Sequence, residues 1–134
     1  MVHSAVNEGL LALTFAVALS VPASAQDAAA GQKDFLVCSA CHQIGPGAQI
    51  AIGPVLNGVV GRKAGTYPGY VYSDANKNSD ITWTEDELQK YLAAPQKVVP
   101  GTKMTFAGFH GDTKKINDVI AFLKQYKADG TKSQ

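Results

Sequence analysis

The sequence has no second pair of cysteines, no H-x-x-x-H motif and no G-x-x-x-x-G-K-[ST] phosphate loop, so neither a common zinc site nor a nucleotide loop is indicated. No internal repeat and no second domain can be recognised in its 134 residues. The formal net charge of +1 is too small to indicate binding to nucleic acid. With 46% hydrophobic and 17% charged residues, the composition is that of an ordinary globular protein.

Residues 1–25 have the features of a secretory signal peptide. Residues 10–21 form an apolar run, and a small-x-small cleavage site ends at Ala25. The segment before the run departs from the usual pattern, because it has no Lys or Arg and contains Glu8. A permanent membrane anchor is the alternative, but the run is short for a membrane span. We therefore predict a cleaved signal peptide and one exported, periplasmic domain, residues 26–134, with 12 basic and 10 acidic residues.

The stretch Cys38-Ser39-Ala40-Cys41-His42 is a C-x-x-C-H motif, which is typical of covalent haem c attachment. On a helix, residues three and four positions apart lie on the same face. Cys38 and Cys41 can therefore present two thiols to the two vinyl groups of one haem, and His42 can reach the iron from below. Thioether bonds would hold the porphyrin, and the iron would need a second axial ligand.

The cysteine pair has three other interpretations. A thioredoxin-like redox pair would follow a strand, and no strand pattern precedes Cys38. Half of a zinc site would need ligands that the sequence does not provide. A plain disulfide of an exported protein is the third alternative. The adjoining His42 and the absence of any other cysteine favour haem.

Several side chains are candidates for the second ligand of the iron. Met104 is the only methionine after the initiator, and a thioether binds reduced iron well and raises the haem potential into the range of an electron carrier. His110 is the only histidine of the mature domain outside the motif and would give a bis-His haem. Lys97 or Lys103 would be ligands at high pH. A methionine that only fills a gap in the core is the remaining alternative.

Two further residues have a possible role beside a haem. Pro54 offers a fixed carbonyl that can accept a hydrogen bond from His42 Nδ1, which would orient the ring and strengthen it as a ligand. An ordinary loop proline is the alternative. Arg62 is the only arginine of the chain and can pair with a carboxylate, including a haem propionate. An exposed surface arginine is the alternative.

Hydrophobic periodicity predicts helices over residues 27–42, 84–94 and 112–127, with one short helical turn at residues 74–77. Gly31 lies inside the first of these helices, where a glycine costs about 1 kcal/mol relative to alanine. Either another helix approaches closely at this point, or the glycine faces solvent near the start of the helix.

Capping signals set the bounds of the second helix. Thr84 and Glu87 form a capping box, and the helix is predicted to end before Pro95. Residues 96–109 are predicted to be a loop, and the residues after Ala128 a frayed tail.

The chain resembles the class I cytochromes c, most closely the short soluble bacterial c-two type, over residues 27–128. This resemblance implies an all-α fold in which the N- and C-terminal helices cross, with Gly31 and Phe35 packed against Val119 and Phe122, while loops and short helices enclose one haem. The motifs that carry it are, in order, Cys38-x-x-Cys41-His42, Gly53-Pro54-x-Leu56, Gly61-Arg62-Lys63-x-Gly65, Tyr72-Ser73-Asp74-Ala75-Asn76-Lys77, Trp83, Tyr91-Leu92 and Pro100-Gly101-Thr102-Lys103-Met104-x-Phe106.

The resemblance also implies a role for individual residues. Cys38 and Cys41 would form the thioether links, and His42 and Met104 would be the axial ligands of the iron. The other implied cofactor contacts are the Pro54 carbonyl to His42, then Arg62, Tyr72 and Trp83 near the propionates, and Asn76 and Tyr91 on the methionine side.

The function implied is that of a periplasmic one-electron carrier, which is not an enzyme and acts as a monomer. In the family the donor is typically a cytochrome bc complex, and the acceptor is a terminal oxidase or a photosynthetic reaction centre. A haem peroxidase or small-ligand binder with a labile Met104 is the alternative. A redox sensor or tethered subunit would require the apolar N-terminal segment to persist.

One departure from the resemblance concerns the surface around the haem edge. Many relatives carry a ring of lysines there, which steers acidic redox partners. In this chain four of the matching positions are Val37, Ala51, Gln96 and His110. We therefore expect weaker steering and a shallower dependence of partner association on salt.

Overall fold

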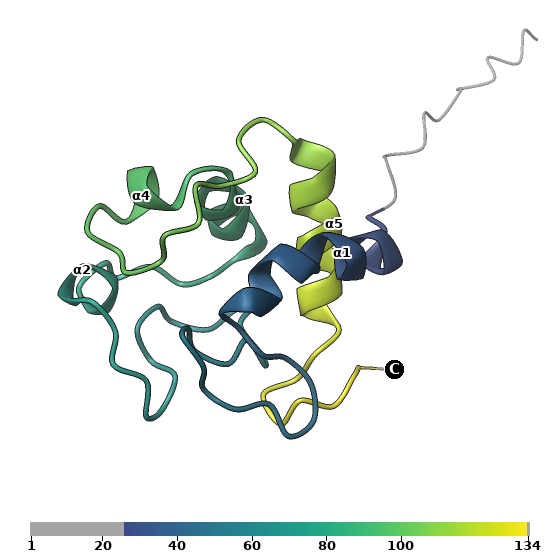
Figure 1. Cartoon of the computed structure of the whole chain (residues 1–134), viewed down its shortest axis with the longest axis horizontal. Helices are drawn as coiled ribbons and strands as arrows, with labels where there is room; N and C mark the ends of the chain where they lie inside the picture. Colours follow the sequence, from purple (N-terminus) through teal and green to yellow (C-terminus); the bar gives the residue numbers. More distant parts are fainter. Residues whose placement is uncertain (1–25, 134) are drawn as a thin grey trace, which may run out of the picture.

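The computed structural model describes residues 26–133, and this part of the chain is built from short helices joined by long loops (Figure 1). Two isolated antiparallel bridges are its only extended pairings. The all-α prediction is therefore confirmed. In order, the elements are α1 (Ala28–Asp34), the 3-10 helix η1 (Phe35–Ala40), α2 (Asp74–Lys77), α3 (Glu85–Ala93), α4 (Pro95–Val98) and α5 (Thr113–Lys124).

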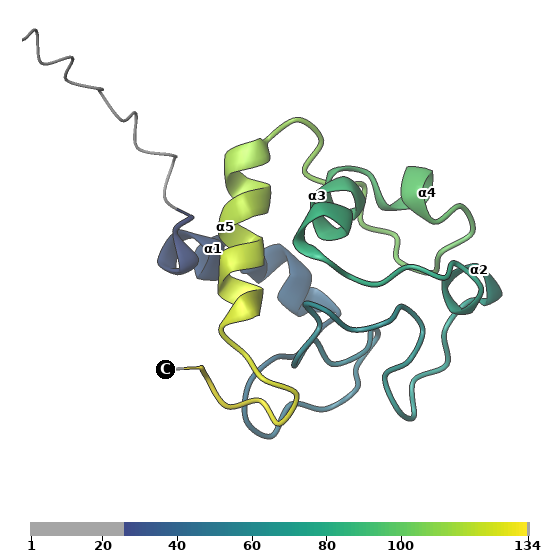
Figure 2. The ribbon, with the colours of Figure 1, turned by 180° about the vertical axis from the view of Figure 1, so that it is seen from behind.

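The first and last helices cross and touch, as both ribbon views show (Figures 1 and 2). Gly31 lies at the crossing, where a Cβ atom would be only 1.8 Å from the carbonyl oxygen of Asp118. Only a residue without a side chain permits this approach. Of the two interpretations of Gly31, the close approach of another helix is the one observed.

Asp118 ties the start of α1 to α5. Its side chain is only 3% exposed. It accepts a hydrogen bond from the Asp27 N–H at 2.9 Å and forms an ion pair with Lys114. The hydrogen bond from Lys114, and then that from Asp27, hold the pKa of the Asp118 carboxyl below its usual range. The buried charge is thus paired, as burial of a charge requires.

Asp27 itself starts the first helix. Its carboxylate accepts hydrogen bonds from the backbone N–H groups of Ala29 and Ala30, which would otherwise have no partner in the helix. One residue therefore caps α1 and also binds α5 through its own backbone N–H.

Aromatic pairs fill the space on the inner side of the crossing. The rings of Phe35 and Phe122 lie 5.1 Å apart between centroids, which confirms the expected packing of these two residues. The rings of Trp83 and Tyr91 lie 4.6 Å apart in the same hydrophobic core. All four side chains are buried, and such offset pairs add to the hydrophobic stabilisation.

The first predicted helix is wrong in its second half. Residues 27–42 were expected to form one α-helix, but the chain changes to the tighter 3-10 form at Phe35, and that helix ends at Ala40. Cys41 and His42 follow as a turn, with both backbone N–H groups bonded to the Cys38 carbonyl. The tighter winding replaces i,i+4 bonds by i,i+3 bonds, which local propensity does not reveal.

The capping box at the start of α3 is only half formed. Thr84 Oγ1 accepts from the Glu87 N–H at 3.2 Å, as predicted. The reciprocal bond is absent, because the Thr84 N–H bonds to the Thr82 carbonyl and the Glu87 carboxylate pairs with Lys90. The basic side chain one turn later competes for the carboxylate.

Three predictions about the last third of the chain are wrong. Residues 96–109 were predicted to be loop throughout, but α4 occupies the start of this range, since Pro95 is well suited to a first helical position. α5 ends at Lys124 rather than near residue 127. The tail after Ala128 is not frayed, because it turns back and Lys132 pairs with Tyr126 in an antiparallel bridge.

The predicted signal peptide, residues 1–25, lies outside the described residues. Within residues 26–133, no helix has the length and apolar character needed to cross a membrane.

The Gly31→Ala substitution should destabilise the protein by about 3 kcal/mol, because the added methyl group collides with backbone that cannot move aside. Denaturant unfolding of the holoprotein would measure this. Gly111→Ala is the matched control, since its Cβ would meet nothing within 4 Å, and it should change the free energy of unfolding by less than about 1 kcal/mol. Equal effects of the two substitutions would contradict the argument.

Candidate haem-binding site

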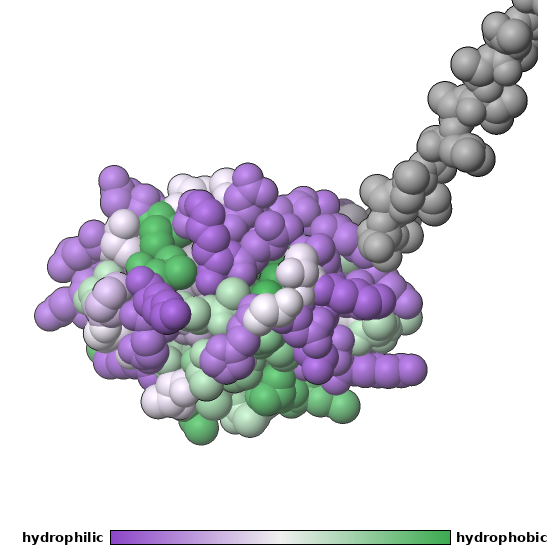
Figure 3. All heavy atoms as spheres, turned by 90° about the horizontal axis from the view of Figure 1, so that it is seen from above, coloured by the Kyte–Doolittle hydropathy of each residue, from purple (hydrophilic) through white to green (hydrophobic). Residues whose placement is uncertain are grey.

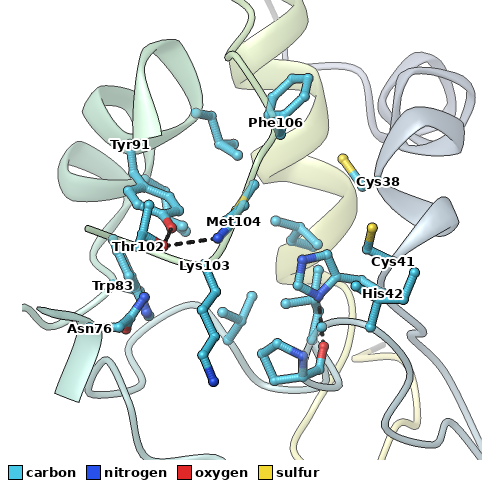
Figure 4. Close-up of a pocket in the computed structure, with 18 of the residues that line it drawn as sticks. Cys38, Cys41, His42, Asn76, Trp83, Tyr91, Thr102, Lys103, Met104 and Phe106 are labelled. Atoms are coloured by element: carbon cyan, nitrogen blue, oxygen red, sulfur yellow. Dashed lines mark hydrogen bonds between the residues drawn. The ribbon is translucent and has the colours of Figure 1, made fainter. Parts of the chain in front are cut away.

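A cavity of about 170 Å³ opens between the wall formed by η1 and the wall formed by α3 and the loop before α5 (Figure 4). All ten residues predicted from the sequence as site residues line it. They are Cys38, Cys41, His42, Pro54, Arg62, Tyr72, Asn76, Trp83, Tyr91 and Met104. Apolar side chains complete the lining, among them Phe35, Leu56, Val59, Leu88, Leu92, Phe106, Val119 and Leu123.

The two thiols project from the same wall as His42 (Figure 4). Cys38 and Cys41 are free thiols, and no disulfide joins them. Burial, and then the neighbouring Cys41, raise the pKa of the Cys38 thiol to about 11.

The remaining interpretations of the cysteine pair do not fit this wall. No group of three or more His, Cys, Asp or Glu side chains able to hold a metal ion occurs in the part of the chain that the structure describes. No strand precedes Cys38 within that part either, so the setting of a thioredoxin-like pair is missing.

His42 is held in one orientation. Its Nδ1 lies 2.7 Å from the carbonyl oxygen of Pro54, so the predicted hydrogen bond is present. A Cβ atom on Gly53 would lie 2.4 Å from the ring, which therefore packs directly on the backbone. Burial lowers the pKa of His42, and the charge of Arg62 adds to this, whereas the bond to Pro54 acts against it. The imidazole is thus neutral at pH 7, with Nδ1 as donor and Nε2 free to coordinate.

Met104 comes from the opposite wall, on an extended segment between α4 and α5 (Figure 4). Its N–H donates to Thr102 Oγ1 at 3.2 Å, and the same oxygen lies 3.2 Å from the Tyr91 hydroxyl. Of the competing ligands, His110 is exposed and, like Lys97, does not line the cavity. Lys103 does line it, but its ammonium donates to the Val71 carbonyl.

Two of the residues that line the cavity, Arg62 and Asn76, each have a buried polar atom without a hydrogen-bond partner. Arg62 donates to the carbonyls of Val55 and Asn57 at 3.1 and 3.0 Å, and its guanidinium stacks on the Tyr67 ring at 5.2 Å. Arg62 Nε and Asn76 Oδ1 are nonetheless buried without a hydrogen-bond partner among the described residues. Such groups are costly unless something else in the cavity satisfies them.

The family described as Cytochrome c matches residues 28–127.

This chain belongs to the cytochrome c family.

Individual relatives agree with this assignment. This chain is 54% identical over 124 residues to cytochrome c2 of Blastochloris viridis. The match covers 92% of this chain and 94% of that protein. It is 57% identical over 108 residues to cytochrome c2 of Rhodoblastus acidophilus, covering 81% of this chain and all of that one.

Solved structures give the same result for the fold. Cytochrome cH from Methylobacterium extorquens superimposes with a TM-score of 0.68 at 52% identity, covering 73% of this chain and 97% of that one. Cytochrome c2 from Rhodospirillum centenum superimposes with a TM-score of 0.72 at 35% identity, and the match covers 75% of this chain and 98% of that one. The cytochrome c fold predicted from the sequence is therefore confirmed, and the chain is an electron carrier of the cytochrome c2 kind rather than an enzyme.

As a member of this family, the protein carries haem c, covalently attached through Cys38 and Cys41. The cavity fits that group. Its walls are largely apolar, as a porphyrin requires, and the sulfur atoms of Cys38 and Cys41 share one wall. The unpartnered Arg62 Nε matches a carboxylate such as a propionate. When bound, the haem supplies an iron that accepts and returns one electron.

Two contacts of this cavity were not assigned from the sequence. Thr102 links Tyr91 to the Met104 backbone, and its position two residues before the methionine was the only available signal. The Tyr70 hydroxyl donates to the Ile52 carbonyl at 3.0 Å. The partners lie 18 positions apart in two loops, and no local pattern indicates such a contact.

Gly53→Ala should displace the His42 ring, because the methyl group would occupy space that the ring fills. We expect a loss of about 1–3 kcal/mol in the free energy of unfolding of the holoprotein, together with shifted paramagnetic NMR signals of the His42 ring. Gly111→Ala should leave both unchanged. Unshifted His42 signals in Gly53→Ala would contradict this account of the orientation.

Proposed function

We propose that the chain is an exported, periplasmic one-electron carrier whose haem iron is held by His42 and Met104. The observation that supports this best is the arrangement of the two walls. One presents the neutral, oriented imidazole of His42, and the other presents the thioether of Met104, which is the only methionine among the described residues. A histidine and a methionine together raise the haem potential into the range of an electron carrier.

The surroundings of the site suit rapid electron exchange. Both iron positions would be occupied by protein side chains, so no substrate needs to enter. Trp83, Tyr91 and Leu92 are each 6–7% exposed and line the cavity. Tightly packed side chains change little between two charge states of a buried group. The geometry would therefore stay similar in the ferric and ferrous forms.

A haem peroxidase or small-ligand binder is the weaker alternative. It would need Met104 to leave the iron and an acid–base side chain to lie beside the open position. His110 is the one candidate that the sequence offers, and it is exposed and does not line the cavity. No contact in the described residues favours this function.

Replacing Met104 by leucine tests the ligand assignment. We expect the ferric far-red band, which reports the iron–sulfur bond, to disappear and the reduction potential to fall by on the order of 100 mV. Optical redox titration of the purified holoprotein measures both. His110→Asn is the control, because asparagine tolerates the positive φ of 53° at this position, and it should change neither. A parent protein without the band would contradict Met104 ligation.

The redox partners are proposed to be membrane complexes that dock briefly at the haem edge, with a cytochrome bc complex as donor. A terminal oxidase or a photosynthetic reaction centre would be the acceptor, and the cytochrome would act as a monomer. Val37 and Ile52 line the mouth of the cavity and are 51% and 74% exposed, and Val71 is 75% exposed. Hydrophobic side chains also gather along one edge of the face seen in Figure 3. Such a surface favours contact by apolar burial.

Charge around this mouth is sparse. Residues 35–73 and 95–111 contain no Asp or Glu, and the latter segment has only Lys97 and Lys103 as basic residues. The lysines that steer acidic partners in many relatives are thus largely replaced by uncharged side chains. Long-range attraction between this face and an acidic partner is correspondingly weak.

The rate of association with a bc-type complex should therefore fall by less than about threefold between 10 and 200 mM salt, whereas strong steering changes such rates by 10- to 1000-fold. Stopped-flow mixing measures this dependence. Adding charge with Val37→Lys and Ala51→Lys, both at exposed positions, should make it steeper. A steep dependence in the parent protein would show that charges elsewhere do the steering.

A further inference from the structure

The segment that carries Met104 is held by very few hydrogen bonds. Within residues 26–133, the backbone of residues 103–108 takes part in two, and both involve Met104. Its N–H donates to Thr102 Oγ1 at 3.2 Å, which is a local contact. Its carbonyl accepts from Gln96 Nε2 at 2.7 Å, and this is the one bond that joins the segment to a helix.

The ends of this segment are fixed independently of Gln96. Before it, the Thr102 N–H bonds to the Val99 carbonyl at 3.0 Å. After it, the N–H groups of Phe109 and His110 bond to carbonyls at the end of α3, at 2.8 and 3.0 Å. Apart from the bond from Gln96, the middle of the segment has no such anchor, and at its start the Lys103 ammonium donates to the Val71 carbonyl at 2.9 Å. Segments with few backbone hydrogen bonds are the ones that open most readily.

Gln96 is well placed to act as an anchor. It follows Pro95, which is almost completely buried and occupies the first position of α4. The short helix is closed by the bond from the Val99 N–H to the Pro95 carbonyl at 2.9 Å. The backbone of Gln96 is therefore fixed, while its side chain lies on the surface and reaches eight positions along the chain to Met104.

We propose that Gln96 is a positioning residue of the electron carrier, whose carboxamide holds Met104 in place through its backbone carbonyl. The inference rests on the proposed ligation of the iron by Met104. When the thioether leaves the iron, the residue must move, and the bond to Gln96 breaks with it. Removing this bond favours the detached state, in which an external ligand can reach the iron. The apparent affinity for such a ligand scales with the population of the detached state.

Binding of imidazole to the ferric holoprotein tests this, because imidazole must displace Met104. Gln96→Leu keeps the size of the side chain and removes the donor, and it should raise the apparent affinity about 2- to 5-fold, as expected for loss of one exposed hydrogen bond. Gln96→Arg retains an N–H donor that cannot itself bind iron, and its affinity should remain close to that of the parent.

Gln89→Leu is the matched control. Gln89 Nε2 also donates across two elements, from α3 to Asn117 Oδ1 on α5 at 2.9 Å, but away from the methionine segment. Its loss should lower stability without raising the affinity for imidazole. An unchanged affinity in Gln96→Leu, or an equal increase in Gln89→Leu, would overturn the role of Gln96.

The far-red band separates this result from a failure of the proposed function. In all four proteins, the band should be present before imidazole is added and disappear on binding. A parent protein that lacks the band overturns Met104 ligation, and the role of Gln96 with it. If the band is present and the affinity of Gln96→Leu is unchanged, only the role of Gln96 is wrong.

Discussion

The contact between backbone atoms where α1 crosses α5 is the constraint on which the rest of the structure depends. Without a side chain at Gly31, the first helix lies directly on the carbonyl of Asp118. This fixes the direction of η1, and therefore of the two cysteines that follow. The same crossing places Phe35 on one side and Val119 and Leu123 on the other, and all three line the cavity. The haem site is thus built on the helix crossing rather than beside it.

The two walls of the cavity are stabilised in different ways. The wall with His42 is formed by residues close in sequence, since the Pro54 carbonyl that orients the ring lies 12 positions away. Direct packing of the ring on Gly53 leaves it little freedom. The wall with Met104 is an extended segment that side chains hold from outside, through Thr102 and Gln96. We therefore expect the histidine side to be the rigid half of the site and the methionine side the adjustable one.

Much of this arrangement could be predicted from the sequence, because its motifs report on local chemistry. The C-x-x-C-H pattern and the cap at Thr84 each reflect contacts that short-range rules describe. The sequence left two interpretations of Gly31 open, because its contact with Asp118 is far away along the chain. The resemblance to class I cytochromes c then predicted which residues, distant in the sequence, share one site. All ten predicted site residues do line one cavity.

The features that were missed depend on competition between partners that local patterns do not rank. The 3-10 winding of η1 and the helical turn at Pro95 are local alternatives of similar energy, decided by packing. The Glu87 carboxylate forms an ion pair with Lys90 instead of accepting the capping hydrogen bond from the Thr84 N–H. The returning tail pairs Tyr126 with Lys132 around Asp129-Gly130, a turn signal that the prediction of a frayed tail did not use. None of these errors moved a residue out of the cavity.

The order of the two walls along the chain has a consequence for assembly. The segment with both cysteines and His42 comes 62 positions before Met104. If the chain is exported as proposed, the attachment segment crosses the membrane well before the segment that carries Met104. Attachment of haem at that stage meets an open surface instead of a closed cavity. The methionine segment would then close over a group already in place, and this step would complete the ligand set proposed for the iron.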